Sequence, residues 1–398
     1  MIKNHQLLQN KTVHTSPFKY FFGPSFFSPM ECSKILEWLE RDVSWKLHTE
    51  YFFDQYEAAI DYRDPTFPLK DIFNDDWIWA IKKELTEIYN CQFNNFSLFG
   101  CHKFIDAQGV GIHNDDSTCP SYETHRLVIY FNESYHDSNG GNLVLFGSKD
   151  KRDIRKIIRP LSNSYFGFAV SNTSYHAVTT INNHVRYSLN LSFWDDRYSN
   201  NEVELFDRIS CDKTVSSEKI YKFLIQCGAK DVKHSSSDVY SHLVNTACVL
   251  LNIGSEDYLM LAALFHSIYG TSCAEALAYP VEKRDEIVSL IGPKAEEIAY
   301  LYCMIERKKL YRLISDAKNQ PVLLRNGLES IVSINTLADL LLLDVANSIE
   351  QYERIGNTQS EINDDLEFYL RQRLLNEKYK KGIIDEYSKV KSTTDVSN

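Results

Sequence analysis

The spacing of apolar residues changes about halfway along the chain. Between about Phe93 and Trp194, apolar residues form short runs with turn-forming clusters between them, a pattern typical of β-strands. The runs cover residues 96–105, 125–132, 141–147, 157–161, 164–170 and 187–194. Many short strands with regular turn signals indicate a sandwich or a barrel.

From about Cys211 onward, apolar residues recur with the period of a helix,. The segments that fit are 215–227, 239–251, 258–267, 274–277, 284–291, 294–306, 310–317, 331–349 and 364–381. Two more helices are predicted before the strands. The first begins at Ser28, which can form a capping box with Glu31 across Pro29, and the second covers residues 76–89,.

Length and composition favour two folded domains. The chain has 398 residues, of which 43% are hydrophobic and 24% charged, and it is too long for one typical domain. We expect a β-rich domain over residues 1–205, a helical domain over 206–385 and a flexible tail over 386–398. The polar stretch 195–202 is the predicted linker.

The charge of the chain and its lack of long apolar runs limit the kinds of partner that we expect. The formal net charge is −11 and no strongly basic stretch offsets it, so duplex nucleic acid is not expected as a partner. We find neither a signal-peptide core nor an apolar run of membrane-spanning length. The nine cysteines are scattered, which suits reduced thiols. The expected protein is cytoplasmic and has no membrane partner.

The segment GVGIHNDDS contains the most informative chemistry. His113 and Asp115 lie on or just past a strand end, where residues two apart share a face,. His176 lies between later strand-like runs, and Arg186 and Ser188 follow on the last strand. Two histidines and one carboxylate leave a face of an octahedral ion open, which suits non-haem Fe(II). A nearby arginine can hold the distal carboxylate of a dicarboxylic acid.

These motifs resemble the Fe(II)/2-oxoglutarate-dependent dioxygenases, particularly the prolyl-4-hydroxylase-like branch, over residues 20–195. FFSPMEC, CHKFIDAQGVGIHND, SNGGNLVLF, SYFGFAVSNTSYHAV and RYSLNLSFW occur in the family's order. The resemblance implies a double-stranded β-helix (jelly-roll) with flanking helices. It also implies Fe(II) on His113, Asp115 and His176, O2 as oxidant, and 2-oxoglutarate held by Arg186 with Ser188. Some relatives place a phenol at the position of Tyr130.

The same resemblance bears on the reaction. Halogenating relatives lack the metal-binding carboxylate, so Asp115 implies hydroxylation or another oxidation, with 2-oxoglutarate converted to succinate and CO2. An amino acid, a peptide or protein side chain and a small metabolite all remain open as substrates. The segment 51–66 is rich in Tyr and Asp, and we interpret it as a substrate-facing lid.

The second half resembles the helical HD superfamily of metal-dependent phosphohydrolases over about residues 230–350. His242, His266 and Asp339 correspond to three ligands of that family's metal site. Ser267 stands where the family has an aspartate, which a hydroxyl replaces poorly as a metal ligand. The resemblance therefore implies an all-α domain with a degenerate site, with Asp344 and Asn347 as alternative partners.

Two hypotheses follow for the whole chain. In the first, it is an Fe(II)/2-oxoglutarate oxygenase whose helical domain binds substrate, senses a ligand or mediates homo-oligomerisation. In the second, the helical domain is a nucleotide-binding or phosphohydrolase module and the β domain regulates it.

Overall fold

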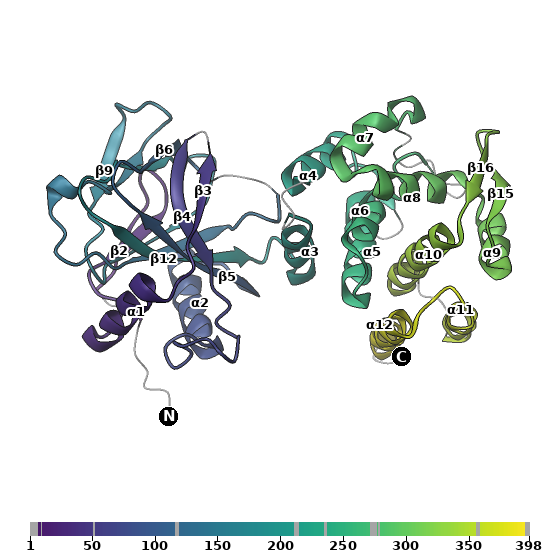
Figure 1. Cartoon of the computed structure of the whole chain (residues 1–398), viewed down its shortest axis with the longest axis horizontal. Helices are drawn as coiled ribbons and strands as arrows, with labels where there is room; N and C mark the ends of the chain where they lie inside the picture. The colour runs from purple at the N-terminus through teal and green to yellow at the C-terminus, as the bar shows by residue number, and fades with distance from the viewer. Residues whose placement is uncertain are drawn as a thin grey trace. The chain divides into compact units, whose positions relative to one another are not determined.

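The computed structural model describes residues 7–8, 10–50, 52–115, 119–210, 215–234, 237–270, 277, 279–355 and 359–394. The chain forms two compact units, residues 1–200 and residues 201–398. The first contains most of the strands and the second most of the helices (Figure 1). The predicted segment 274–277 and the last residues of the predicted tail, 395–398, lie outside the described residues, except for residue 277.

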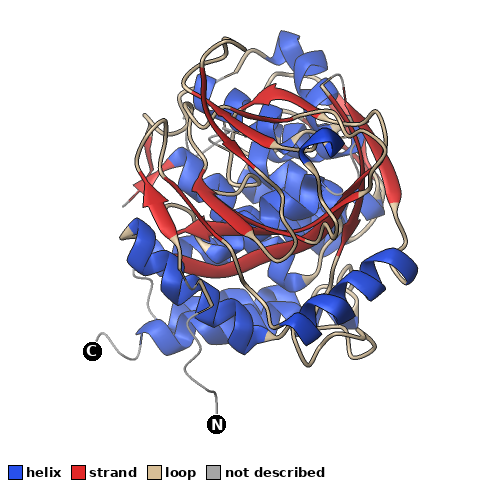
Figure 2. Cartoon of the chain, turned by 90° about the vertical axis from the view of Figure 1, so that its left-hand side faces the viewer, coloured by secondary structure: helices blue, strands red, loops and turns tan. Residues whose placement is uncertain are grey.

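Twelve strands of the first unit form one antiparallel sheet, which curls around an interior (Figure 2). The strands are β1 (Thr12–His14), β2 (Tyr20–Gly23), β3 (Lys46–Glu50), β4 (Phe53–Ala59), β5 (Phe93–Phe104), β6 (Val110–His113), β7 (His125–Tyr130), β8 (Leu143–Phe146), β9 (Ile154–Ile158), β10 (Tyr165–Ala169), β11 (His176–Val178) and β12 (Arg186–Asp195). Their order is β1-β2-β10-β7-β12-β5-β4-β6-β11-β8-β9, and β3 pairs with β4. A curled antiparallel sheet is what the predicted jelly-roll requires.

Two helices cover one face of this sheet. Helix α1 (Pro29–Arg41) begins with the predicted capping box, in which Ser28 accepts from the Glu31 amide and Glu31 accepts from the Ser28 amide. Helix α2 (Asp75–Tyr89) is capped by Asn74. Their apolar side chains pack on β2, β5, β7, β10 and β12 in one large core. A smaller inner cluster, defined by nine buried residues, fills the inside of the curled sheet. Its members are Phe18, Tyr20, Val128, Tyr130, Leu143, Leu145, Ile158, Phe166 and Phe168.

Trp194 anchors the last strand of the sheet, which makes it a sensitive point for stability. Its side chain is fully buried, and its indole Nε1 donates to the Pro120 carbonyl oxygen at 2.8 Å. We expect Trp194→Ala to lower the free energy of unfolding by about 3–5 kcal/mol, because it leaves a large cavity. Trp79→Ala is the control, since Trp79 is 66% exposed and should change stability by less than about 0.5 kcal/mol.

Urea unfolding followed by tryptophan fluorescence measures this difference. All five tryptophans lie in the first unit, so the signal is specific to it. Equal unfolding midpoints for the two variants would contradict the role assigned to Trp194.

The second unit consists mainly of helices. They are α3 (Asn200–Ser210), α4 (Ser217–Gln226), α5 (Val239–Ile253), α6 (Asp257–Phe265), α7 (Arg284–Ile291), α8 (Pro293–Met304), α9 (Arg307–Asp316), α10 (Ile334–Ile355), α11 (Gln359–Leu370) and α12 (Glu377–Thr394). Two hairpins, β13 (Lys233–His234) with β14 (Ser237–Asp238) and β15 (Gln320–Leu323) with β16 (Glu329–Val332), correct the all-α expectation. No described helix combines the length and apolar character that a membrane span requires.

Three boundaries differ from the sequence pattern for identifiable reasons. Helix α3 begins inside the predicted linker, because Val203 and Phe206 are buried at helical spacing. The predicted helix 364–381 is divided into α11 and α12, and the Asn376 side chain caps the second by accepting from the Tyr379 amide. Helix α12 continues into the predicted flexible tail as far as Thr394. Tyr387, which lies in this part of the helix, is buried and only 1% exposed.

Candidate active site

Strand alternation places four polar side chains on the inner face of the sheet. Strands β7 and β12 pair with Ser188 opposite Tyr130 and Ser192 opposite Arg126. Tyr130 belongs to the inner cluster. Side chains two residues apart share a face, so Arg126 and Tyr130 of β7 and Arg186 and Ser188 of β12 face the same interior.

His113 and His176 lie directly opposite each other on the paired strands β6 and β11, and their ring centroids are 4.2 Å apart. The Nδ1 of His113 lies 2.9 Å from the Gly111 carbonyl oxygen, and the Nδ1 of His176 lies 2.8 Å from the Ser174 carbonyl oxygen. A carbonyl only accepts, so both rings carry their proton on Nδ1. Each Nε2 atom therefore points away from the backbone, which is the orientation that metal-binding histidines need.

Asp115 completes this group from just beyond the end of β6. Its backbone has a φ of +56°, so the chain leaves the extended conformation there. Its Oδ1 lies 3.4 Å from His113 Nε2, and its Oδ2 lies 3.4 Å from His176 Nε2. One ligand atom from each of the three residues lies within 4.8 Å of the others. Two imidazoles and a carboxylate are a donor set that suits Fe(II).

Arg126, which the sequence pattern did not single out, holds the carboxylate in place. Its Nη1 lies 2.9 Å from Asp115 Oδ2, and its Nη2 pairs with Glu123. Burial alone would raise the pKa of Asp115, but the Arg126 cation and the two imidazoles hold it well below its usual value. Burial lowers the pKa of His176 to about 4. The group is thus a carboxylate with a neutral imidazole at neutral pH.

Arg186 is a buried cation without an anion. Its side chain lies between the rings of Phe104 and Tyr130, 5.2 and 5.0 Å from their centroids, and the residue is 4% exposed. Among the described residues no carboxylate pairs with it, and its Nε is buried without a hydrogen-bond partner. The Tyr130 hydroxyl lies close enough to interact with the guanidinium. Because an unpaired buried charge is costly, this position fits the distal carboxylate of 2-oxoglutarate. Ser188 lies next along the same face, opposite Tyr130.

Gly141, the second glycine of the segment SNGGNLVLF, leaves room for the Arg186 side chain. Its φ is +66°, and a Cβ at this position would lie 2.5 Å from Ile181 Cδ1 and 3.1 Å from Arg186 Cδ. Any larger residue would therefore be strained, would displace the Ile181 side chain and would press on the arginine stem.

Two other residues border this site. The ring of Phe52 lies 5.3 Å from the ring of His113, which brings part of the predicted lid segment beside the triad. His102 of β5 lies opposite Ser188. Burial and the nearby Arg126 and Arg186 cations lower the pKa of His102 to about 3, so it is neutral. Like Arg126, His102 was not singled out by its position in the sequence.

The second unit brings two of its three predicted ligands together. His242 of α5 and His266, just past α6, are 3% and 1% exposed, and their Nε2 atoms lie 3.0 Å apart. His242 Nδ1 contacts Glu350 Oε2 at 2.6 Å. Asp339 is elsewhere, and its Oδ1 accepts from Tyr258. Within the described chain, no group of three ligand atoms joins Asp339 to the two histidines, which corrects that part of the prediction.

The two alternative partners, Asp344 and Asn347, make other contacts, and Asn347 Oδ1 accepts from Gln351 Nε2 at 3.4 Å. Asp344 is fully buried, and it pairs with Arg307 and accepts hydrogen bonds from Tyr302 and Tyr369. Glu350, the acidic residue that does reach His242, was not predicted.

Two sequence families match parts of the chain. Residues 99–194 match the 2OG-Fe(II) oxygenase superfamily, and residues 223–307 match a domain of unknown function, DUF6817. No curated protein matches the chain. The resemblance of the second half to HD phosphohydrolases has no support among these matches.

Similar solved structures include three enzymes, each of which covers less than half of this chain. A prolyl-4-hydroxylase of Pseudomonas putida is 15% identical, with a TM-score of 0.37, and covers 44% of this chain and 91% of its own. A Trichoplax adhaerens prolyl hydroxylase in complex with a hypoxia-inducible-factor peptide is 13% identical (TM-score 0.38; 47% and 86% covered). A 2OG-Fe(II) oxygenase-family oxidoreductase of Burkholderia pseudomallei is 16% identical (TM-score 0.36; 46% and 87% covered).

The matched segment 99–194 contains His113, Asp115, His176 and Arg186. Fe(II), 2-oxoglutarate and O2 are the cofactor and cosubstrates that this superfamily implies, and the donor set of the triad and the unpaired cation of Arg186 fit the first two. This part of the chain therefore resembles an oxygenase of the 2OG-Fe(II) superfamily in both sequence and site chemistry.

Proposed function

We propose that the protein is an Fe(II)- and 2-oxoglutarate-dependent hydroxylase acting on an amino acid, a peptide or protein side chain or a small metabolite. The observation that carries this proposal is the gathering of His113, Asp115 and His176 beside a buried arginine that lacks an anion. Bound Fe(II), with 2-oxoglutarate and O2, supplies the oxidation of a substrate C–H bond, with succinate and CO2 as co-products.

The chain's own residues orient these groups. The carbonyl oxygens of Gly111 and Ser174 fix the rings of His113 and His176 so that both Nε2 atoms lie beside Asp115, where the three residues would hold the ion. Arg126 holds Asp115 ionised and turned toward the same point. Each ligand is thus oriented by a hydrogen-bonding or charged partner that is not itself a metal ligand.

Arg186 and Tyr130 bind the far end of the cosubstrate. The guanidinium offers a planar pair of N–H donors to the distal carboxylate, and the Tyr130 hydroxyl can donate to the same group. The charged pair forms in a region where both residues are almost fully buried, so water competes little with it.

Succinate formation from 2-oxoglutarate, dependent on Fe(II), tests the proposal. The purified chain should convert 2-oxoglutarate slowly without a substrate and faster with the correct one, so candidate amino acids, peptides and metabolites can be ranked by the increase. Strictly metal-independent turnover, or none under any condition, would contradict the proposal.

Tyr130→Phe should raise the KM for 2-oxoglutarate by about 10-fold or more, because a hydrogen bond to a charged group contributes roughly 1.5–3 kcal/mol. The ring that packs against Arg186 remains, so metal affinity should not change. Steady-state kinetics of succinate formation give the KM. Tyr175→Phe is the control, since Tyr175 lies outside the inner cluster. An unchanged KM for Tyr130→Phe would remove Tyr130 from the cosubstrate site.

A further inference from the structure

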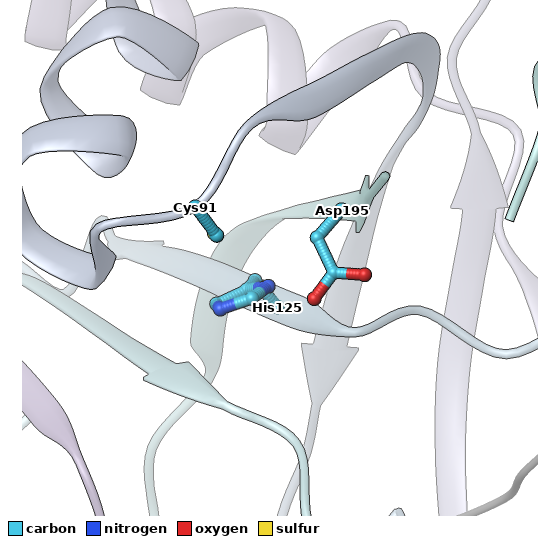
Figure 3. A group of neighbouring side chains, drawn as sticks. All are labelled: Cys91, His125 and Asp195. Atoms are coloured by element: carbon cyan, nitrogen blue, oxygen red, sulfur yellow. The ribbon is translucent and has the colours of Figure 1, made fainter. Parts of the chain in front are cut away.

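A second group of metal-ligating side chains lies in the first unit. Cys91, His125 and Asp195 come from three separate segments and point toward one another (Figure 3). One ligand atom from each lies within 4.8 Å of the others. Cys91 follows α2, His125 begins β7 and Asp195 ends β12. None of the three takes part in the candidate active site.

The imidazole of His125 is held in a fixed orientation. The rings of Tyr89 and Phe93 pack against it, with centroids 4.4 and 4.9 Å away. Its Nδ1 lies 2.9 Å from Thr124 Oγ1. That hydroxyl donates its only proton to the Phe193 carbonyl oxygen at 3.1 Å, so it accepts from Nδ1–H. The lone pair of His125 is therefore on Nε2, the arrangement found in metal-binding histidines.

The other two side chains can donate to the same ion. Asp195 is 7% exposed and accepts from Arg197 Nε at 2.9 and 3.1 Å through its two oxygens. A carboxylate offers about four lone-pair positions, so it can keep this ion pair and bind a cation as well. Cys91 is half-buried and is not part of a disulfide.

We propose that Cys91 Sγ, His125 Nε2 and one carboxylate oxygen of Asp195 bind a Zn²⁺ ion. A thiolate, an imidazole and a carboxylate are the three ligand types that zinc uses. A thiolate ligand disfavours Mg²⁺, Ca²⁺ and Mn²⁺, which prefer oxygen. Tetrahedral zinc geometry places such ligand atoms roughly 3.5 Å apart. One ligand atom of each residue lies within 4.8 Å of the others, so closing these distances takes about 1.3 Å at most. Solvent would take the fourth position.

The charges support this assignment. Zn²⁺ with one thiolate, one carboxylate and one neutral imidazole sums to zero. The Arg197 cation that pairs with Asp195 has a largely exposed side chain, so its charge is in contact with solvent. Burial lowers the pKa of His125 to about 4, which leaves the imidazole neutral. Burial, with Asp195 and Asp196 nearby, raises the pKa of the Cys91 thiol to about 11. A bound cation would displace that proton, as is usual for thiolate sites.

The positions of Cys91, His125 and Asp195 in the fold indicate that a bound ion would stabilise the first unit. The ion would join the loop after α2 to the first residue of β7 and the last residue of β12. These elements contribute to the large core and to the inner face that carries Arg186. Zinc binding should therefore stabilise the first unit against unfolding.

Cobalt(II) substitution distinguishes this site from the candidate iron site, because only a cysteine ligand gives a thiolate-to-metal charge-transfer band. Metal-free full-length protein titrated with Co²⁺ should show this band, and His176→Ala should keep it. Cys91→Ser should lose it, and Asp195→Asn should weaken Zn²⁺ binding by more than about 10-fold. Cys32→Ser is the matched control, because Cys32 is also half-buried in the first unit with its pKa raised to about 11.

Thermal unfolding provides an independent measurement. Zn²⁺ should raise the melting temperature of the native chain and of Cys32→Ser but not that of Cys91→Ser, and the melting temperature without metal shows whether each variant folds. A native chain without a thiolate band, or a band that survives Cys91→Ser, would overturn the proposal. Neither result depends on turnover, so the zinc site and the proposed oxygenase function can fail separately.

Discussion

Replacing His176 with alanine is expected to reduce Fe(II)-dependent succinate formation to background, and His113→Ala and Asp115→Ala should do the same. Each variant removes one of only three protein ligands, so the expected loss exceeds the roughly 10–100-fold that follows removal of an outer-shell partner. His176 should be the most sensitive, because it is 5% exposed and water cannot easily replace its ring. Succinate detection by mass spectrometry, with saturating iron and 2-oxoglutarate, measures the effect.

A control variant and a metal-binding measurement show whether the loss of activity comes from the loss of a metal ligand. His14→Ala removes a histidine of the edge strand β1, whose ring stacks on Tyr20 and Phe22, and it should retain activity. Calorimetry with Mn²⁺ should show weaker binding in all three triad variants. If Mn²⁺ affinity were unchanged in all three, the ion would have to bind elsewhere.

Arg186→Ala should raise the KM for 2-oxoglutarate by roughly 30-fold or more. Truncating one partner of a buried charge pair costs about 2–5 kcal/mol, and each 1.4 kcal/mol corresponds to about tenfold in affinity. Arg186→Lys should recover only part of this loss, because an ammonium lacks the planar fork. Steady-state kinetics with 2-oxoglutarate varied at saturating iron give both values.

Comparing the KM for 2-oxoglutarate with the affinity for Mn²⁺ distinguishes the loss of this role from a general loss of structure. Mn²⁺ affinity of Arg186→Ala should stay near that of the native chain, because the guanidinium is not a metal ligand. A normal KM in the alanine variant would place the cosubstrate anchor on another residue, and equal losses of metal and 2-oxoglutarate binding would indicate a collapsed site.

Local signals in the sequence predicted much of the first unit. The capping box at Ser28 and the alternating runs that became β5, β7, β10 and β12 depend only on neighbouring residues. Short strands such as β6 and β11 have four and three residues, too few for a periodic pattern. Arg126 was missed because its role depends on the register between β7 and β12 rather than on a motif.

The second unit shows a different limit of prediction from the sequence, which concerns contacts between helices. Its helices follow from their apolar spacing, but the acidic partner of His242 does not. Asp339 and Glu350 lie eleven residues apart on α10, which is about three turns, so they share a face but are separated by roughly 16 Å along the axis. The pattern identifies that face, whereas only the packing of α5 against α10 decides which of the two meets the histidines.

The left-handed backbone at Asp115 bears on how such a site could change during evolution. Glycine adopts a φ of +56° without strain,. This relief of strain would largely offset the loss of stability that comes from glycine's greater flexibility in the unfolded chain. Arg126 would keep Glu123 as a partner. A single base change converts an aspartate codon to a glycine codon. The carboxylate thus occupies a position where it can be lost with little cost to folding, and new metal chemistry could arise there before any other residue adapts.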